Sequence, residues 1–197
     1  MFLSIPASVA LVIGSEQIIS ALFGYGSFTY NSVLNSANAL YYFGLGLPAF
    51  ALIKVFSIFF FANHDTKTPF YISLVSVLLN ILISVYFFKD IGFIIIPIAT
   101  TISSWFNSLM LFIYLKNNNL FEFNKTFFKQ FVKIIFASIM MGIFFQYLIL
   151  LFDNQLSYTY FFKSAYLLIC VLFTIIFYFA LSYFIKAFNY QDIKLKY

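Results

Sequence analysis

Few side chains in this sequence could do chemistry, and one of them, Lys54, lies inside a long apolar stretch. A charge held within a lipid bilayer costs about 3 kcal/mol, so a lysine kept there is a candidate functional group. Two interpretations stay open: the ammonium group faces a cavity that attracts anions, or it extends along its aliphatic stem to the membrane surface. We favour the cavity because Gly44, Gly46 and Pro48 in the same stretch permit a helix kink and close packing of neighbouring helices.

A stripe of hydroxyl and amide groups occurs in another apolar stretch, at spacings of three and four residues. This spacing places most of the groups on one face of a helix. The groups are Thr100, Thr101, Ser104, Asn107 and Ser108, and Asn80 lies in the stretch before them. The stripe either forms hydrogen bonds between packed helices or lines one wall of a hydrophilic cavity. On the second interpretation, Asn80, Thr101, Ser104 and Asn107 are substrate-cavity candidates.

Glu16 is a further cavity candidate, because it is a carboxylate in the first apolar stretch. In the alternative interpretation, Glu16 has no role in a cavity and, beside Ser15 and Gln17, extends to the outer headgroup region. The sequence leaves both roles open.

We do not expect catalysis by a zinc site, by a nucleophile in a recognisable motif, or at a phosphate-binding loop. The sequence has one histidine, His64, and one cysteine, Cys170, whereas a zinc site needs three or four His, Cys or carboxylate ligands. No serine stands in a recognisable nucleophile motif, and the glycine-rich segments lack the phosphate-binding pattern. We therefore predict a protein that is not an enzyme and uses no metal or other cofactor.

The elements that must position these groups are membrane-spanning helices. The chain of 197 residues is 63% hydrophobic and 9% charged, whereas soluble domains have about 25% charged residues. One span needs roughly 20 mostly apolar residues. Six stretches qualify: 2–23, 38–62, 69–88, 93–115, 130–152 and 164–187. The predicted fold class is all-α, a polytopic bundle of six transmembrane helices.

We expect two parts in this bundle. The first four helices, within residues 1–115, carry most of the polar groups. Residues 116–197 supply two further helices with aliphatic and aromatic interiors and a short cytoplasmic tail.

The lysines predict the orientation of the chain. If all six stretches span, one side of the membrane holds eight of the 11 basic residues: Lys67, Lys116, Lys125, Lys129, Lys133, Lys186, Lys194 and Lys196. The other side holds only Lys89 and Lys163. Because lysines accumulate on the cytoplasmic side, both termini should be cytoplasmic. The scattered lysines form no clustered basic face, so we expect no nucleic-acid partner.

A polar turn follows the second stretch. Pro69 is favourable at the first position of a helix, and the oxygens of Asp65 and Thr68 can accept hydrogen bonds from the free N–H groups at that helix start. We interpret these three residues as a structural turn.

The residues from Lys54 to this turn resemble a known family. The segment 54–69 is similar to the stretch that runs from a lysine to Asp-x-(Lys/Arg)-Thr-Pro in the MurJ/MviN lipid II flippases. Residues 22–29, Leu-Phe-Gly-Tyr-Gly-Ser-Phe-Thr, resemble that family's Leu-Phe-x-x-Gly-x-Phe turn, and residues 42–50 fit the helix between the two motifs. The similarity is good over residues 3–115 and only compositional beyond them.

The resemblance implies the last six helices of a fourteen-helix fold in the multidrug/oligosaccharidyl-lipid/polysaccharide exporter superfamily. It implies transport of a lipid-linked anionic cell-wall precursor across the bacterial cytoplasmic membrane, in contact with membrane lipid. The family's cavity arginines lie in its first eight helices, and this sequence contains no arginine. Because the chain also begins inside an apolar stretch, we expect a fragment or half of a split gene, inactive without an N-terminal eight-helix partner.

Two alternatives stay open. The chain could belong to an exporter of another lipid-linked oligosaccharide, or it could be a non-transporting membrane scaffold or assembly subunit. A neighbouring reading frame with eight spans and cavity arginines would favour the flippase, and its absence would favour the scaffold.

Overall fold

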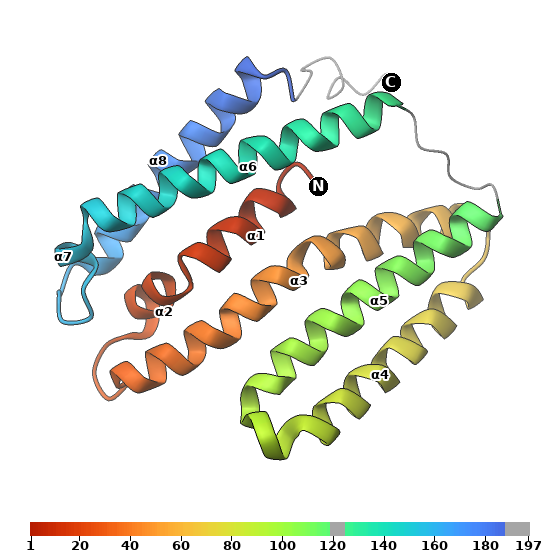
Figure 1. Cartoon of the computed structure of the whole chain (residues 1–197), viewed down its shortest axis with the longest axis horizontal. Helices are drawn as coiled ribbons and strands as arrows, with labels where there is room; N and C mark the ends of the chain where they lie inside the picture. Colours follow the sequence, from red (N-terminus) through yellow and green to blue (C-terminus); the bar gives the residue numbers. More distant parts are fainter. Residues whose placement is uncertain (119–124, 188–197) are drawn as a thin grey trace. The chain divides into compact units, whose positions relative to one another are not determined.

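The computed structural model describes residues 1–118 and 125–187, and the regular elements within these ranges are all helices (Figure 1). In chain order they are α1 (Ser4–Ile13), α2 (Ser15–Phe23), α3 (Tyr30–Ala62), α4 (Lys67–Ile91), the 3₁₀ turn η1 (Gly92–Ile94), α5 (Ile95–Asn117), α6 (Lys125–Leu151), α7 (Asp153–Leu156) and α8 (Lys163–Phe184). The predicted all-α class is confirmed. The expected tail, with Lys194 and Lys196, lies outside the described residues.

Four helical stretches in the described ranges are long and apolar enough to cross a membrane. One of them, Lys67–Asn117, contains both α4 and α5, which η1 joins into a hairpin. The bent pair α1 and α2 would supply a fifth. These lengths support a multi-pass membrane protein, whereas the total of six spans stays a prediction.

The first expected span, 2–23, is not one straight helix. It is divided at Gly14 into α1 and α2, which are bent by 77°. A side chain at position 14 has no room, because a Cβ atom there would lie 2.6 Å from Cε1 of Phe145. Gly14 therefore permits α6 to pack directly against the break, which the hydropathy of the sequence does not reveal.

Helix α3 begins eight residues before the expected start at position 38. Its first turn is polar, and the N–H of Ser32 donates to the hydroxyl oxygen of Thr29 at 3.3 Å. A side chain that accepts from a free N–H group stabilises a helix start. The expected connection 24–37 is consequently reduced to residues 24–29, because the helix extends beyond its apolar part.

The described chain packs as two compact units, which are described separately. Among the described residues, unit 1 contains residues 1–37 and 125–187, and unit 2 contains residues 38–118. This grouping differs from the expected parts 1–115 and 116–197, because α1 and α2 pack against α6 and α8. One link between these distant segments is a hydrogen bond of 2.7 Å from the Tyr178 hydroxyl to the carbonyl oxygen of Phe2. Whether 116–197 is a functional addition stays a prediction.

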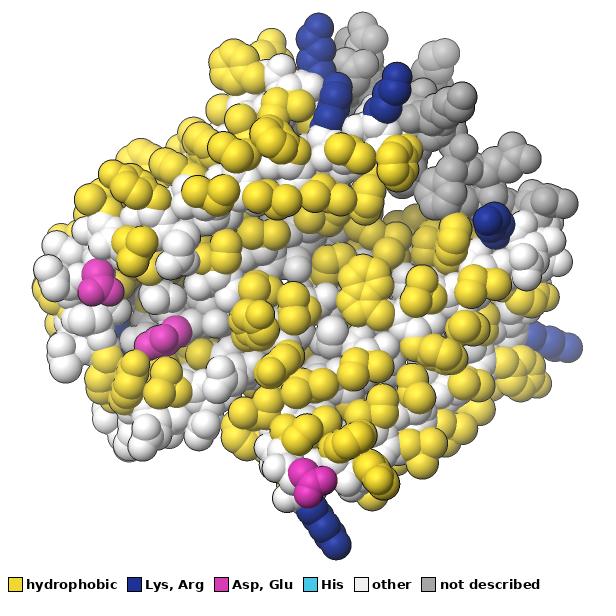
Figure 2. Space-filling model, in the orientation of Figure 1, with side chains coloured by type: hydrophobic (Ala, Val, Ile, Leu, Met, Phe, Trp, Pro, Cys, Tyr) yellow, Lys and Arg dark blue, Asp and Glu magenta, His cyan; other side chains and the backbone are white. Residues whose placement is uncertain are grey.

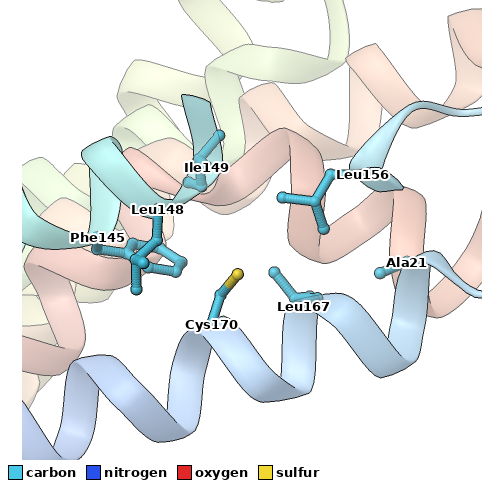
Figure 3. Close-up of a cluster of buried hydrophobic side chains, with 7 residues drawn as sticks. All are labelled: Ala21, Phe145, Leu148, Ile149, Leu156, Leu167 and Cys170. Atoms are coloured by element: carbon cyan, nitrogen blue, oxygen red, sulfur yellow. The ribbon is translucent and has the colours of Figure 1, made fainter. Parts of the chain in front are cut away.

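The core of unit 1 joins α2, α6, α7 and α8 (Figure 3). Its members are Ala21, Phe145, Leu148, Ile149, Leu156, Leu167 and Cys170. The Cys170 thiol is free and buried among these apolar side chains, so it serves as a small packing residue.

Unit 2 consists of the larger part of α3 with the α4–η1–α5 hairpin. Gly92 has φ of +74°, a backbone conformation that glycine adopts without steric cost, and it ends α4. Phe56 and Phe60 of α3 form a buried cluster with Leu111 and Leu115 of α5. This cluster holds α3 and α5 together at the end of the unit next to the 63–66 turn.

Many hydroxyl side chains in the helices are satisfied within their own helix. Each donates to the carbonyl oxygen four residues earlier, at 2.6 to 2.8 Å. The donors are Ser57, Ser76, Thr100, Ser104, Ser138 and Thr174. Such bonds remove the need for a partner on another helix.

Large hydrophobic side chains cover most of the visible surface (Figure 2). On α4, Leu82, Val85 and Tyr86 are 67%, 72% and 77% exposed. Exposed apolar area of this extent would be unstable in water but matches a lipid environment or a further helix layer.

Candidate functional site

A polar seam joins α3 to α5 in unit 2. The Thr101 hydroxyl donates to the carbonyl oxygen of Tyr42 at 2.6 Å, and the indole N–H of Trp105 donates to that of Leu45 at 3.1 Å. Thr101 and Trp105 are one helical turn apart, so both face α3. Gly46 makes this approach possible, because a Cβ atom there would lie 3.0 Å from Oγ1 of Thr101.

The helix-kink candidates lie in the same part of α3 as Tyr42 and Leu45. Gly44 and Gly46 are buried, and Pro48 is inside α3. Helix α3 continues through Pro48 without a break. A kink at these residues stays a prediction.

Asn80 connects α4 to α5. Its side-chain amide donates to Oγ1 of Thr100 at 3.1 Å and to Oγ of Ser103 at 3.3 Å. An amide that would be costly in an apolar environment is thereby satisfied by the neighbouring helix.

Asn107 and Ser104 occupy the buried side of α5. Asn107 is 7% exposed, and its Nδ2 donates to Oγ of Ser73 on α4 at 3.3 Å. The Ser104 hydroxyl donates to the carbonyl oxygen of Thr100 in its own helix. Asn80, Thr101 and Asn107 thus bond to a neighbouring helix, as in the first of the two interpretations of the stripe, whereas the Ser104 bond lies within α5. Their role in a substrate cavity stays a prediction.

Lys54 is exposed on α3, eight residues before the last residue of that helix, Ala62. Eight residues correspond to about 12 Å along the helix. Glu16 belongs to unit 1, so the structure does not place these two charged candidates relative to each other.

Glu16 lies on α2 and accepts a hydrogen bond of 2.8 Å from the Tyr30 hydroxyl. The same side chains line a hollow of about 560 Å³ at this end of unit 1. Acidic side chains gather over α2 and α7 on the visible face (Figure 2). The hollow was not predicted, because α7 and the 157–162 loop, which complete it, are distant in sequence from Glu16.

Lys163 is the buried charge that the sequence reasoning missed. Only 1% of this lysine is exposed. Its Nζ donates to the carbonyl oxygens of Gly24 at 2.6 Å and Tyr158 at 2.7 Å, and it lies 4.4 Å from the ring centre of Tyr25. The ammonium group therefore ties the α2–α3 connection to the start of α8. Counted only as a loop lysine, Lys163 carried no sequence signal for this role.

The turn between α3 and α4 combines two helix caps. His64, two residues after the end of α3, has φ of +57°, and the N–H of Asp65 donates back to the carbonyl oxygen of Phe60 at 3.0 Å, the pattern of a Schellman cap. Oδ1 of Asp65 then accepts from the N–H groups of Lys67 at 3.1 Å and Thr68 at 3.0 Å.

Two details of the expected turn need correction. Helix α4 begins at Lys67, so Pro69 is its third residue and not its first. Thr68 acts as a donor: its hydroxyl and backbone N–H groups donate to the Asp65 carboxyl. These hydrogen bonds hold the pKa of that carboxyl below its usual value.

We expect Asp65→Ala to loosen this turn at neutral pH and to matter less in acid. Because the folded-state pKa of Asp65 is lowered, its stabilising contribution is fully present above the unfolded value of about 4 and is lost as pH falls through the folded value. Hydrogen exchange at the Lys67 and Thr68 amides should therefore be several-fold faster in the variant at pH 7, with the difference shrinking below about pH 4. Asp90→Ala, which removes an exposed carboxylate from the other end of α4, should leave these amides unchanged.

Within residues 1–118 and 125–187, no group of three or more His, Cys, Asp or Glu side chains converges.

The sequence is similar to a defined family of membrane proteins. Residues 1–172 match the family model described as lipid II flippase MurJ. The match extends well beyond position 115, where the recognisable motifs end, so the expected limit of the similarity was too short. It includes α6 and the first part of α8.

Curated relatives carry the same description. A "Probable lipid II flippase MurJ" of Rhizobium meliloti is 39% identical over 112 residues, which are 57% of this chain and 21% of the relative. Proteins with that description from Buchnera aphidicola subsp. Baizongia pistaciae and Thermotoga maritima are 33% and 34% identical over 78% and 72% of this chain. The chain spans between a fifth and a third of the length of these relatives: 21%, 29% and 28%.

A solved structure shares the fold. The chain matches "Lipid II flippase MurJ, inward closed conformation" with a TM-score of 0.75 and 29% identity, over 98% of this chain and 37% of that one. With a family model that matches residues 1–172 and a common fold over nearly its whole length, this chain belongs to the lipid II flippase MurJ family.

Proposed function

We propose that this chain forms part of a flippase that moves lipid II, the lipid-linked peptidoglycan precursor, from the inner to the outer leaflet of the bacterial cytoplasmic membrane. The observation that carries the proposal is the family match over residues 1–172. The long apolar helices support it, because a flippase must operate inside the bilayer. The activity is transport, so we assign no catalytic residue.

The partner that we propose is the remainder of a full-length flippase. The relatives are three to five times longer than the part that this chain matches. In transporters built from two helix bundles, the substrate passes between the bundles as one rocks against the other. We propose an eight-helix portion as the second bundle, with this chain supplying helices to the first.

The seam in unit 2 suits this arrangement. Thr101 and Trp105 bind α5 to α3, and Asn80 and Asn107 bind it to α4. Three helices joined by side-chain hydrogen bonds can move as one body. Lys54, exposed on the first of them, is the group that we propose attracts the anionic headgroup from the cytoplasmic side.

The experiment is rescue of flippase-depleted cells by this chain together with an eight-helix N-terminal portion. We expect the pair to restore growth and lipid II flipping, and the chain alone to restore neither. In the rescuing pair, Lys54→Met should lower flipping about ten-fold, because one charge-assisted contact with the headgroup is lost, while Lys54→Arg should retain most of the activity.

Lys89→Met is the matched control, since Lys89 is an exposed lysine in the same unit. It should flip at the wild-type rate. Rescue by the 197 residues alone would contradict the need for a partner, and wild-type flipping by Lys54→Met would show that this lysine only reaches the membrane surface.

We also propose that both termini are cytoplasmic, on the strength of the lysine distribution. In a Cys170→Ser background, single cysteines at Ser27, Asn118 and Thr159 each replace an exposed residue. A membrane-impermeant maleimide added to intact cells should label positions 27 and 159 but not 118. Labelling confined to position 118 would reverse the orientation.

A further inference from the structure

One side of α6 begins with two lysines and continues with exposed apolar residues. These residues recur at spacings of four and three, which places them on one face of the helix. We call them the exposed α6 face: Lys129, Lys133, Phe136, Met140 and Ile143. Lys129 and the three apolar side chains are exposed, and Lys133 is partly buried. The buried residues Ala137 and Met141 lie on another side of the helix, within the core of unit 1.

The cationic start of the exposed α6 face lies beside the end of α8. The Nζ atom of Lys133 donates to the carbonyl oxygen of Lys186 at 3.2 Å, and Lys186 is itself exposed. Among the described residues, this bond uses one of the three N–H donors of Lys133, which leaves two for a ligand. Figure 2 shows basic side chains gathered at this end of unit 1.

The helix dipole adds to the positive charge of these lysines. Acidic side chains are favourable near a helix N-terminus, because that end of the dipole is positive. Helix α6 has no acidic residue in its first turn, and Lys129 and Lys133 occupy the turns that follow. This end of α6 therefore combines two charges with a dipole of the same sign, which favours an anion as its partner.

The carboxylates of unit 1 are too distant to neutralise the lysines. Among the described residues of this unit they belong to Glu16 and Asp153, and both line the hollow beyond the other end of α6. Asp153 is 20 residues after Lys133, which corresponds to about 30 Å along a helix. This length is close to the thickness of the hydrocarbon core, roughly 30 Å. The lysines and the carboxylates thus suit opposite surfaces of a bilayer.

The apolar part of the exposed α6 face has the length of one lipid leaflet. Ile143 is ten residues after Lys133, or about 15 Å along the helix, which is half of the hydrocarbon thickness. The face therefore offers positive charge at the depth of the headgroups and an apolar surface along which an acyl chain can lie. A free phosphate ion would use only the first of these two features.

We propose that the exposed α6 face binds an anionic phospholipid. Its phosphate group accepts charge-assisted hydrogen bonds from the lysines at the start of α6 and the end of α8, and one acyl chain lies along Phe136, Met140 and Ile143. The bound lipid stabilises the contact between α6 and α8 where Lys133 already joins them. The proposal requires only that these helices cross a membrane, so it is independent of flipping.

Fluorescence quenching can report on this face alone, because Trp105 is the single tryptophan of the sequence. In a Trp105→Phe background, Phe136→Trp places the fluorophore one turn after Lys133. The full chain in phosphatidylcholine bilayers is titrated with brominated phosphatidylglycerol, which is anionic, or with brominated phosphatidylcholine, which has no net charge. We expect half-quenching at an about ten-fold lower mole fraction of phosphatidylglycerol.

Loss of the lysine charges should remove this preference. Lys129→Gln and Lys133→Gln should each weaken phosphatidylglycerol quenching about five-fold, which corresponds to the roughly 1 kcal/mol that one lysine contributes near an anionic surface. Glutamine keeps an N–H donor for the Lys186 carbonyl oxygen, so the contact between α6 and α8 is retained. Lys129→Gln lies outside that contact and tests the proposal even if Lys133→Gln lowers the unfolding temperature.

The matched control removes the same charge from unit 2. Lys67→Gln combined with Lys116→Gln replaces two exposed lysines there and should leave the quenching unchanged. Equal quenching by the two brominated lipids would overturn the proposal, as would a preference for phosphatidylglycerol that survives loss of both Lys129 and Lys133. Reversal of the quenching by inorganic phosphate would instead indicate a site for free anions, and would equally exclude a phospholipid site.

Discussion

Lys163→Met lowers the unfolding temperature of the chain more than substitution of any exposed lysine. The ammonium group is 1% exposed and donates to two backbone carbonyl oxygens, those of Gly24 and Tyr158. Methionine fills similar space but leaves both carbonyls without this donor, so we expect a loss of about 3 kcal/mol. Thermal unfolding in detergent, followed by circular dichroism, measures the effect.

Lys89→Met is the control for loss of charge alone, because Lys89 is exposed on the last turn of α4. Its unfolding temperature should match that of the wild type. A stabilised Lys163→Met would contradict the expectation, since it would mean that desolvation of the ammonium group outweighs its hydrogen bonds.

Gly14→Ala should destabilise unit 1 strongly. The added Cβ atom would lie 2.6 Å from Cε1 and 2.9 Å from Cζ of Phe145, whose ring is 1% exposed and cannot move into solvent. Overpacking of this kind costs about 1–3 kcal/mol. The loss should appear as a lower unfolding temperature and as faster hydrogen exchange in α1 and α2.

Phe145→Leu is the second substitution of a double-mutant cycle with Gly14→Ala, because it shortens the side chain that the added methyl group would contact. By itself it should destabilise the core. Combined with Gly14→Ala, it should cost less than the two single variants together, by about 1 kcal/mol. Strict additivity would show that the methyl group is accommodated elsewhere.

The turn from His64 to Pro69 shows what the sequence could predict. Asp65 satisfies N–H groups only two and three residues away, so its contact depends on local chemistry that a sequence displays. Helices α4, α5, α6 and α8 were found for a related reason: long apolar stretches favour membrane helices whatever surrounds them.

Contacts between segments that are distant in the chain could not be predicted from the sequence. The close packing at Gly14 involves Phe145, which is 131 positions away, and the ammonium group of Lys163 donates to the carbonyl oxygen of Gly24. The early start of α3 was missed because its first turns are polar, and apolar periodicity cannot mark a helix there. Asn80 and Thr101 were recognised as candidates, but only the neighbouring helices reveal which groups they bond.

The self-satisfied hydroxyl groups have a consequence for biogenesis. A helix such as α6 or α8, whose Ser138 and Thr174 bond to their own backbone, can leave the translocon for lipid before any neighbour has been synthesised. Helix α4 differs, because the Asn80 amide finds its acceptors, Thr100 and Ser103, only on α5. Because only the short η1 turn separates α4 from α5, those acceptors are synthesised soon after Asn80. The two helices would therefore enter the bilayer as a pair, with the Asn80 amide already hydrogen-bonded when it reaches the hydrocarbon core.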